Sequence, residues 1–133
     1  MLKVERFNMD KTIRFEIVSG INKGYFNESI NKNDNLTLVG EIWQKIAGEE
    51  FEKSNIYISA VIRESKTVYN EIWGCPKGGE ETVIITGVAN YEFIKDIEEW
   101  KGSVIRLAKK LKDILGQNTM TCEFINTELH YFK

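Results

Sequence analysis

Hydrophobic and polar residues alternate along several short stretches of this chain and recur at helical spacing along two longer ones. The clearest alternation is at 12–18, where Ile13, Phe15 and Ile17 share one side and Arg14 and Glu16 the other. A period of two residues is typical of a half-buried strand. The same reading predicts strands over 56–62, 67–73, 81–88 and 119–132, with a turn at 64–66 and an irregularity at Asn126. Apolar side chains on both sides of 81–88 indicate a central strand.

Two segments carry apolar residues at helical spacing. In 36–53 these are Val39, Trp43, Ile46 and Ala47, and Thr37 or Asn35 could cap the start. Gly48 weakens that helix and could end it early. The stronger helix prediction is 96–115, whose apolar stripe runs from Ile97 and Trp100 to Leu115. Asp96 with Glu99 resembles a capping box, and Gly116 suits the position after the last helical residue.

Strand, helix, two or three strands, helix and strand is the element order of a ferredoxin-like α/β sandwich, an α+β fold in a single domain, 1–133. In that fold an antiparallel sheet carries both helices on one face. The other face then needs cover from the long polar loop 19–35, a ligand or another subunit, and we expect a homo-oligomer. The residues expected there are mixed in character: Arg14, Glu16, Tyr57, Ser59 and Arg63.

Composition narrows the classes of partner. The chain has 133 residues, is 42% hydrophobic and 29% charged, and has a net charge of -2. This favours a globular protein over a nucleic-acid binder, because the basic group around Arg106 and Lys109–Lys112 is interpreted as a solvated helix face. Two cysteines, a charged N-terminus and no long apolar run predict a cytoplasmic protein with no membrane partner.

The segment 73–80 is the most unusual stretch of the sequence. It reads Trp-Gly-Cys-Pro-Lys-Gly-Gly-Glu and contains the only proline, one of the two cysteines and three of the ten glycines. Such a composition between two strands predicts a special backbone shape. We predict a ligand site where this turn meets the 19–35 loop, formed by Tyr25, Phe26, Trp73, Lys77, Gly78 and Gly79. A plain hairpin turn is the alternative interpretation.

Candidates for catalysis are sparse. A cysteine nucleophile would be Cys75 or Cys122 with His130, the only histidine, as its base. Glu80 is a further candidate, and Glu64, Glu71 and Glu123 could converge across strands. No metal or cofactor is expected, because three scattered Cys and His residues cannot form a structural zinc site and no nucleotide-binding motif is present.

Three classes of function therefore remain open. The leading hypothesis is a self-associating protein that binds a small molecule or a protein partner near 73–80 and 19–35. The second is a cofactor-independent enzyme that uses Cys75 or a cross-strand carboxylate with His130. The third is a purely structural or assembly protein.

Overall fold

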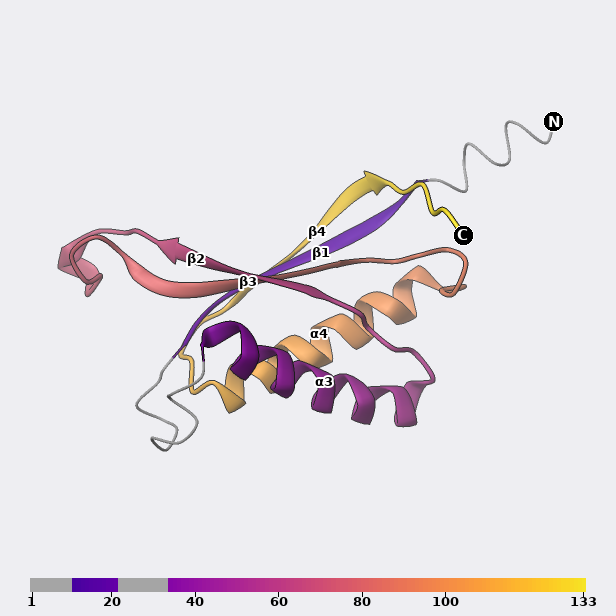
Figure 1. Cartoon of the computed structure of the whole chain (residues 1–133), viewed down its shortest axis with the longest axis horizontal. Helices are drawn as coiled ribbons and strands as arrows, with labels where there is room; N and C mark the ends of the chain where they lie inside the picture. The colour runs from indigo at the N-terminus through magenta and orange to yellow at the C-terminus, as the bar shows by residue number, and fades with distance from the viewer. Residues whose placement is uncertain (1–10, 22–33) are drawn as a thin grey trace.

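The computed structural model describes residues 11–21 and 34–133, and they form a four-stranded antiparallel sheet with two long helices (Figure 1). The elements are β1 (Lys11–Gly20), α3 (Asn35–Ser54), β2 (Val61–Thr67), the short 3₁₀ helix η2 (Glu71–Trp73), β3 (Glu80–Val88), α4 (Ile97–Ile114) and β4 (Thr121–Glu128). The strand order is β2-β3-β1-β4. This is the predicted ferredoxin-like α+β sandwich, with β3 inside the sheet as its apolar pattern indicated.

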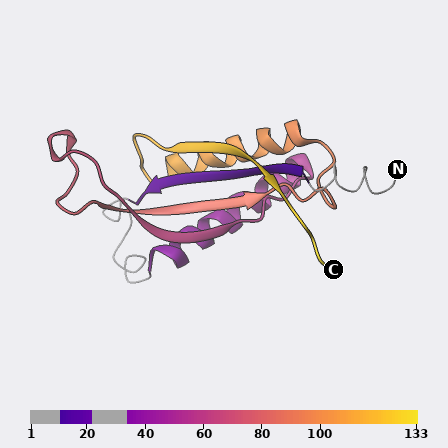
Figure 2. The same cartoon turned by 90° about the horizontal axis from the view of Figure 1, so that it is seen from above.

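Both helices cover the same face of the sheet, as Figures 1 and 2 show, and the core lies between the two layers. Phe15 of β1 is at its centre, with ring centroids 5.9 Å from Trp43 of α3 and 5.8 Å from Trp100 of α4. The indole N–H of Trp43 donates to the carbonyl oxygen of Ile58 at 2.9 Å. The two helix tryptophans are therefore core residues.

The boundaries of α3 differ from the prediction at both ends. The N-cap is Asp34, whose carboxylate accepts a hydrogen bond from the backbone N–H of Thr37, and not Thr37 or Asn35. The helix continues through Gly48 and ends only at Ser54, because Ile46, Ala47 and Glu50 on either side of that glycine are buried. Tertiary packing outweighs the low helix propensity of one glycine.

The predicted strand at 56–62 is wrong over 56–60 and correct only for its last two residues, and the predicted turn at 64–66 is wrong. The segment 56–60 is irregular and passes across Gly87 of β3, where an added Cβ would lie 2.5 Å from the carbonyl oxygen of Ser59. The strand begins only at Val61 and runs straight through 64–66 to Thr67. This is an edge strand, a position where charged side chains are commonly found.

Of the remaining predictions, one is confirmed and two are partly wrong. The prediction of α4 is confirmed, with Asp96 accepting hydrogen bonds from the N–H groups of Glu98 and Glu99, and Gly116 at a positive φ of 64°. The prediction of strand over 67–73 fails beyond Thr67, because Asn70 caps the 3₁₀ helix instead. β4 is shorter than predicted, and Asn126 pairs regularly with Ile13, so no irregularity occurs there.

The face of the sheet opposite the helices, here called the open face, is mixed as predicted. Register places Arg63, Ile84, Val18 and Thr121 in one row across it, and Val61, Thr86, Glu16 and Glu123 in the next. Arg63 lies 4.0 Å from Glu16 and Arg14 donates to the Thr86 hydroxyl at 2.9 Å. Tyr57 and Ser59 were predicted on this face, but they lie outside the strands.

No helix within residues 11–21 and 34–133 combines the length and apolar character needed to cross a bilayer.

Candidate functional site

The connection between β2 and β3 forms a structured projection, here called the hairpin arm (residues 68–79). Figures 1 and 2 show it extending past the end of the sheet and beyond both helices. Its interior is the buried thiol of Cys75, which accepts a hydrogen bond from the backbone N–H of Tyr69 at 3.4 Å. Gly74, Gly78 and Gly79 all have positive φ, and the N–H of Gly79 donates to the carbonyl of Pro76 at 2.9 Å. The unusual composition of 73–80 therefore builds a defined backbone shape, as predicted.

Apolar side chains cover the outside of the hairpin arm. Val68, Ile72 and Trp73 are 70%, 86% and 75% exposed. Large apolar side chains gathered on a projecting segment mark a contact surface for a ligand or a partner. Lys77 and Gly78 are exposed at the tip, whereas Gly79 is buried against Val68 and Thr67. Tyr25 and Phe26, the other predicted ligand residues, lie outside the described residues.

Where the arm joins the sheet, polar side chains gather into a group that we call the polar root (Ser65, Thr67, Tyr69, Glu80 and Thr82). The Thr82 hydroxyl lies 2.7 Å from that of Ser65 and 3.0 Å from that of Thr67. The pKa of the Tyr69 phenol is raised, first by burial and then by the charge of the neighbouring Glu80 carboxylate.

The polar root lies on the open face, with the side chain of Thr82 buried. The register pairs Thr67 with Glu80 and Ser65 with Thr82, which places these side chains on the side of the sheet away from the helices. The group offers one carboxylate, one protonated phenol and three hydroxyls. Such a set can neutralise a cation and hydrogen-bond to hydroxyl or carboxylate groups of a ligand.

Cys75 and His130 do not meet within one chain. Cys75 belongs to the end of the sheet where Thr82 pairs with Gly20, and His130 follows Glu128, which pairs with Lys11 at the other end of β1. The ten residues of β1 span roughly 30 Å. His130 is exposed and hydrogen-bonds to Glu128 at 2.7 Å. The cysteine–histidine dyad fails for a single chain because its members are at opposite ends of the sheet.

The other catalytic combinations fail for similar reasons. Cys122 points into the core opposite Ile17, and burial is the first cause of its raised pKa, with Glu123 the second. Glu64 and Glu123 lie on β2 and β4, the two opposite edges of the sheet, so these carboxylates do not converge. Among the residues that the structure describes, no three Cys, His, Asp or Glu side chains are grouped as metal ligands would be.

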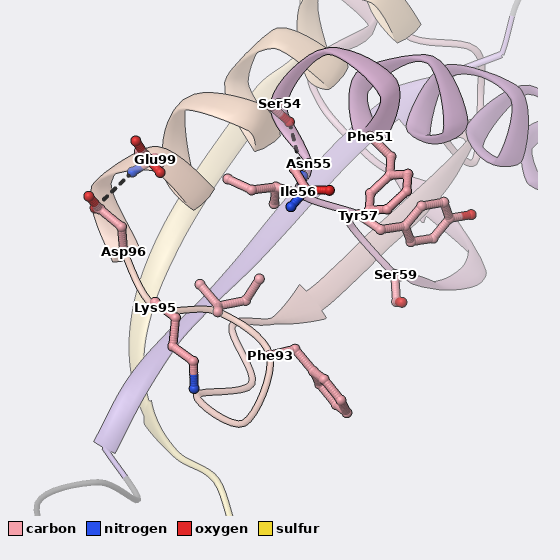
Figure 3. Close-up of a pocket in the computed structure, with 11 residues that line it drawn as sticks. Phe51, Ser54, Asn55, Ile56, Tyr57, Ser59, Phe93, Lys95, Asp96 and Glu99 are labelled. Carbon is pink, nitrogen blue, oxygen red and sulfur yellow. Dashed lines mark hydrogen bonds between the residues drawn. The ribbon is translucent and has the colours of Figure 1, made fainter.

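A second concave region, here called the aromatic cleft, opens near the other end of the sheet, between the C-terminal end of α3, the segment 54–59 and the loop before α4 (Figure 3). Its volume is about 520 Å³. Phe51 and Tyr57 lie side by side at one end with ring centroids 6.3 Å apart, while Asp96 and Glu99 lie at the opposite end (Figure 3). Phe93 lies below them with its ring turned outward (Figure 3).

Sequence reasoning missed both Tyr69 of the polar root and this cleft. Tyr69 was assigned to a strand, and nothing in a single sequence indicates that it pairs with Glu80. The aromatic residues of the cleft come from three separate segments, so only the fold brings them together. A usable signal was Phe93, which lies with Tyr91 and Ile94 in a stretch between the predicted strand 81–88 and the predicted helix 96–115.

A sequence model of one family, described as SAM lyase, matches residues 10–133 of this chain. The chain belongs to the SAM lyase family. The matched region contains every helix and strand described above, including the hairpin arm and the aromatic cleft.

Two solved structures of a phage SAM lyase share this fold. One, in the apo state, is 14% identical, with a TM-score of 0.55 over 93% of this chain and 94% of its own. The other, in complex with S-methyl-5′-thioadenosine, is 16% identical, with a TM-score of 0.55 over 92% of this chain and 93% of its own. A search of the curated proteins gives no match. At these identities the likeness establishes the fold, and the family itself rests on the sequence model.

Proposed function

We propose that this protein is an S-adenosylmethionine lyase that releases S-methyl-5′-thioadenosine. The observation that carries the proposal is the family match across residues 10–133. It is supported by the full-length likeness in fold to a phage SAM lyase that holds S-methyl-5′-thioadenosine. The proposal narrows the sequence-based hypothesis of small-molecule binding to one reaction, and it moves the protein into the class of cofactor-independent enzymes.

The identity of the product defines the bond that breaks. S-methyl-5′-thioadenosine retains the adenosine, the sulfur and the methyl group, so the bond lost joins the sulfonium sulfur to the four-carbon amino-acid chain. A lyase adds no water. The substrate's own carboxylate can attack the carbon of the amino-acid chain that is bonded to sulfur. This attack forms a C–O bond and closes a five-membered lactone. The electron pair of the broken C–S bond passes to sulfur, which leaves as a neutral thioether.

This step needs little chemistry from the protein. No proton is transferred and the leaving group is already activated by its positive charge, so neither a base nor a metal is required. The protein must hold the reacting carboxylate against the carbon and exclude water, which are contributions of orientation. A site without a cysteine–histidine dyad is sufficient for this reaction.

We place the substrate at the polar root. The Glu80 carboxylate, which lies near the Tyr69 phenol, would balance the positive charge of the substrate. The hydroxyls of Ser65 and Thr67, which contact the buried hydroxyl of Thr82, would bind its polar groups. Trp73 on the hairpin arm offers a flat apolar surface for the adenine ring. In this arrangement three predicted ligand residues would shape the hairpin arm and would not contact the substrate. They are Lys77 and Gly78 at the exposed tip and the buried Gly79.

We also propose that the protein self-associates through the open face. Apolar residues such as Val18, Val61 and Ile84 lie there among charges of both signs, including Arg63 and Glu16. Ile72 of the hairpin arm is also 86% exposed. A second copy on this face would cover the polar root and exclude water from it. Both described cysteines are free thiols, which supports the proposed cytoplasmic location.

The test is to incubate purified protein with S-adenosylmethionine and to follow S-methyl-5′-thioadenosine by chromatography and the four-carbon product by NMR. The expected early product is a lactone free of ¹⁸O when the reaction is run in H₂¹⁸O. Absence of S-methyl-5′-thioadenosine would refute the activity. Hydroxy acid as the first product, labelled at the hydroxyl, would show hydrolysis.

Variants test the location. We expect Glu80→Gln to lower kcat/KM about 100-fold, as removal of one electrostatic contact to reacting charge commonly does. Tyr69→Phe should lower it less, because the carboxylate remains. His130→Ala is the matched control and should change kcat/KM less than about twofold, since His130 lies at the other end of the sheet. Full activity of Glu80→Gln, in protein shown to be folded, would remove the polar root from the mechanism.

A further inference from the structure

The aromatic cleft is lined by side chains that the core does not use. Phe51, Tyr57 and Phe93 are 44%, 43% and 67% exposed, and they come from α3, from the segment after it and from the loop before α4. Phe51 and Tyr57 meet edge to face, with 69° between their planes. Ile56 and Ile94 also line the cleft. Three exposed aromatic rings around one cavity form an apolar surface that a ligand would cover.

The charge of the cleft favours one class of ligand. Asp96 and Glu99 lie at the end opposite Phe51 and Tyr57 (Figure 3). Within the part of the chain that the structure describes, no cationic side chain forms a salt bridge with either carboxylate. Lys95 also lines the cleft and carries one positive charge, with its ammonium group 3.5 Å from the carbonyl oxygen of Tyr91 and 3.4 Å from that of Glu92. Asp96 caps α4 by accepting from the N–H groups of Glu98 and Glu99. Two carboxylates against one ammonium group leave the lining with a net charge of -1.

We propose that the aromatic cleft is a second binding site, separate from the polar root, for a small organic cation with alkyl groups on its nitrogen or sulfur. The faces of aromatic rings attract such cations electrostatically, and the alkyl groups gain from leaving water. The net negative charge of the lining adds long-range attraction. A volume of about 520 Å³ is within the range of small-molecule sites.

Position separates this site from the proposed substrate site. The cleft shares Tyr57 and Phe93 with a neighbouring hollow that reaches Val88 at the end of β3, whereas Glu80 begins that strand at the hairpin arm. Glu80 and Val88 are the two ends of this nine-residue strand, roughly 26 Å apart in an extended chain. A ligand in the cleft therefore cannot contact the polar root of the same chain.

The test uses tetramethylammonium as the probe and tert-butyl alcohol as a neutral counterpart with the same tetrahedral shape. Binding to the full chain is followed by NMR, through shifts of the backbone amides around Phe93. We expect the cation to bind at least tenfold more tightly than the alcohol. Phe93→Ala and Tyr57→Ala should each weaken binding about threefold to fivefold, which is the usual strength of one cation–π contact.

Matched controls identify the cause of any change. Glu99→Gln should weaken cation binding, whereas Glu98→Gln, one residue away and paired with Lys101 at 3.8 Å, should not. Phe132→Ala is the aromatic control, because Phe132 is exposed and does not line the cleft.

Cleavage of S-adenosylmethionine by the same variants distinguishes a separate binding site from the substrate site. Retained cleavage with weakened probe binding supports a separate site. Equal binding of cation and alcohol, or unchanged binding in Phe93→Ala, would overturn the proposal. Loss of cleavage in folded Phe93→Ala and Tyr57→Ala would also overturn it, because the cleft would then be the substrate site. Absence of cleavage in the unaltered protein would refute the proposed function and leave the probe result intact.

Discussion

Glu50 of α3 contacts Ser103 and Arg106 of α4, and this contact gives the sharpest prediction about stability. The Glu50 side chain is 3% exposed and accepts hydrogen bonds from the Ser103 hydroxyl at 2.9 Å and from Nη2 of Arg106 at 2.8 Å. Its pKa is lowered, chiefly by the hydrogen bond from Arg106, with burial acting in the opposite direction. The carboxylate is therefore charged at neutral pH, and the hydrogen bond from Arg106 contributes most to favouring that form.

Replacing Arg106 with Ala leaves a buried carboxylate with one hydroxyl partner. Breaking a buried ion pair in this way costs about 3–5 kcal/mol. The Arg106 side chain is 55% exposed, so water can reach the vacated position, and we expect a loss near the lower limit, about 3 kcal/mol. Urea unfolding at pH 7 measures it. The matched control is Arg63→Ala, whose exposed contact to Glu16 at 4.0 Å should contribute less than about 1 kcal/mol.

The pH dependence tests the cause. A carboxylate whose pKa is lowered on folding contributes stability that is present above its unfolded pKa, near 4.5, and is lost as pH falls through the folded pKa. In Arg106→Ala the unpaired Glu50 can take up a proton, so the difference from the unaltered protein should shrink between pH 7 and pH 4. An equal loss at both values, or a loss at pH 7 no larger than that of Arg63→Ala, would refute the electrostatic argument.

Two further predictions concern packing. Gly87→Ala should destabilise the fold by more than about 2 kcal/mol, because its Cβ would lie 2.5 Å from the Ser59 carbonyl oxygen and 2.6 Å from the Phe15 ring. Gly48→Ala, with nothing within 4 Å of the added carbon, should instead stabilise it by up to about 1 kcal/mol, and thermal unfolding of the pair checks the contrast. Cys75→Ala should lower stability by about 1–2 kcal/mol through the lost interior of the hairpin arm, with little effect on chemistry. Abolished cleavage in Cys75→Ala that still folds would instead restore the thiol as a catalytic group.

The sequence predicted the layers of the fold well because the apolar periods are strong where the layers touch. In α4 the stripe from Trp100 to Leu111 coincides with the buried side, and Phe15 and Ile17 of β1 are fully buried as their alternation indicated. In a long periodic segment, the apolar pattern itself indicates which side is buried. The fold class followed from the order of these segments.

Local signals failed where a contact with a distant residue decides the backbone. The segment 56–60 alternates like a strand, but it passes across the bare backbone of Gly87, a residue far along the chain. The residues 67–73 have strand-like composition, but a 3₁₀ helix capped by Asn70 and the thiol of Cys75 hold them in the arm. Neither partner can be identified from the segment itself.

The candidate site was predicted in part. The composition of 73–80 indicates the hairpin arm, and Glu80 at its end is among the residues that the sequence predicts. Tyr69 was missed because its role depends on the pairing of Thr67 with Glu80, which turns two separate positions into neighbours. The reaction itself could not be inferred from residue types, because the proposed chemistry needs no base, thiol or metal that a motif would reveal.

The strand order has a consequence for how the chain folds. β1 is the first described strand, yet its partners on both sides are β3 and β4, which come much later in the sequence (Figure 1). Among the strand pairs, β2 with β3 is the local one, so the hairpin that carries the arm can form before the centre of the sheet exists. Closing the long loops around β1 should limit the rate, and refolding in milliseconds to seconds is expected of such non-local pairing. During synthesis β1 must wait for the last strand to emerge, so a nascent chain halted before Thr121 would leave one side of β1 unpaired.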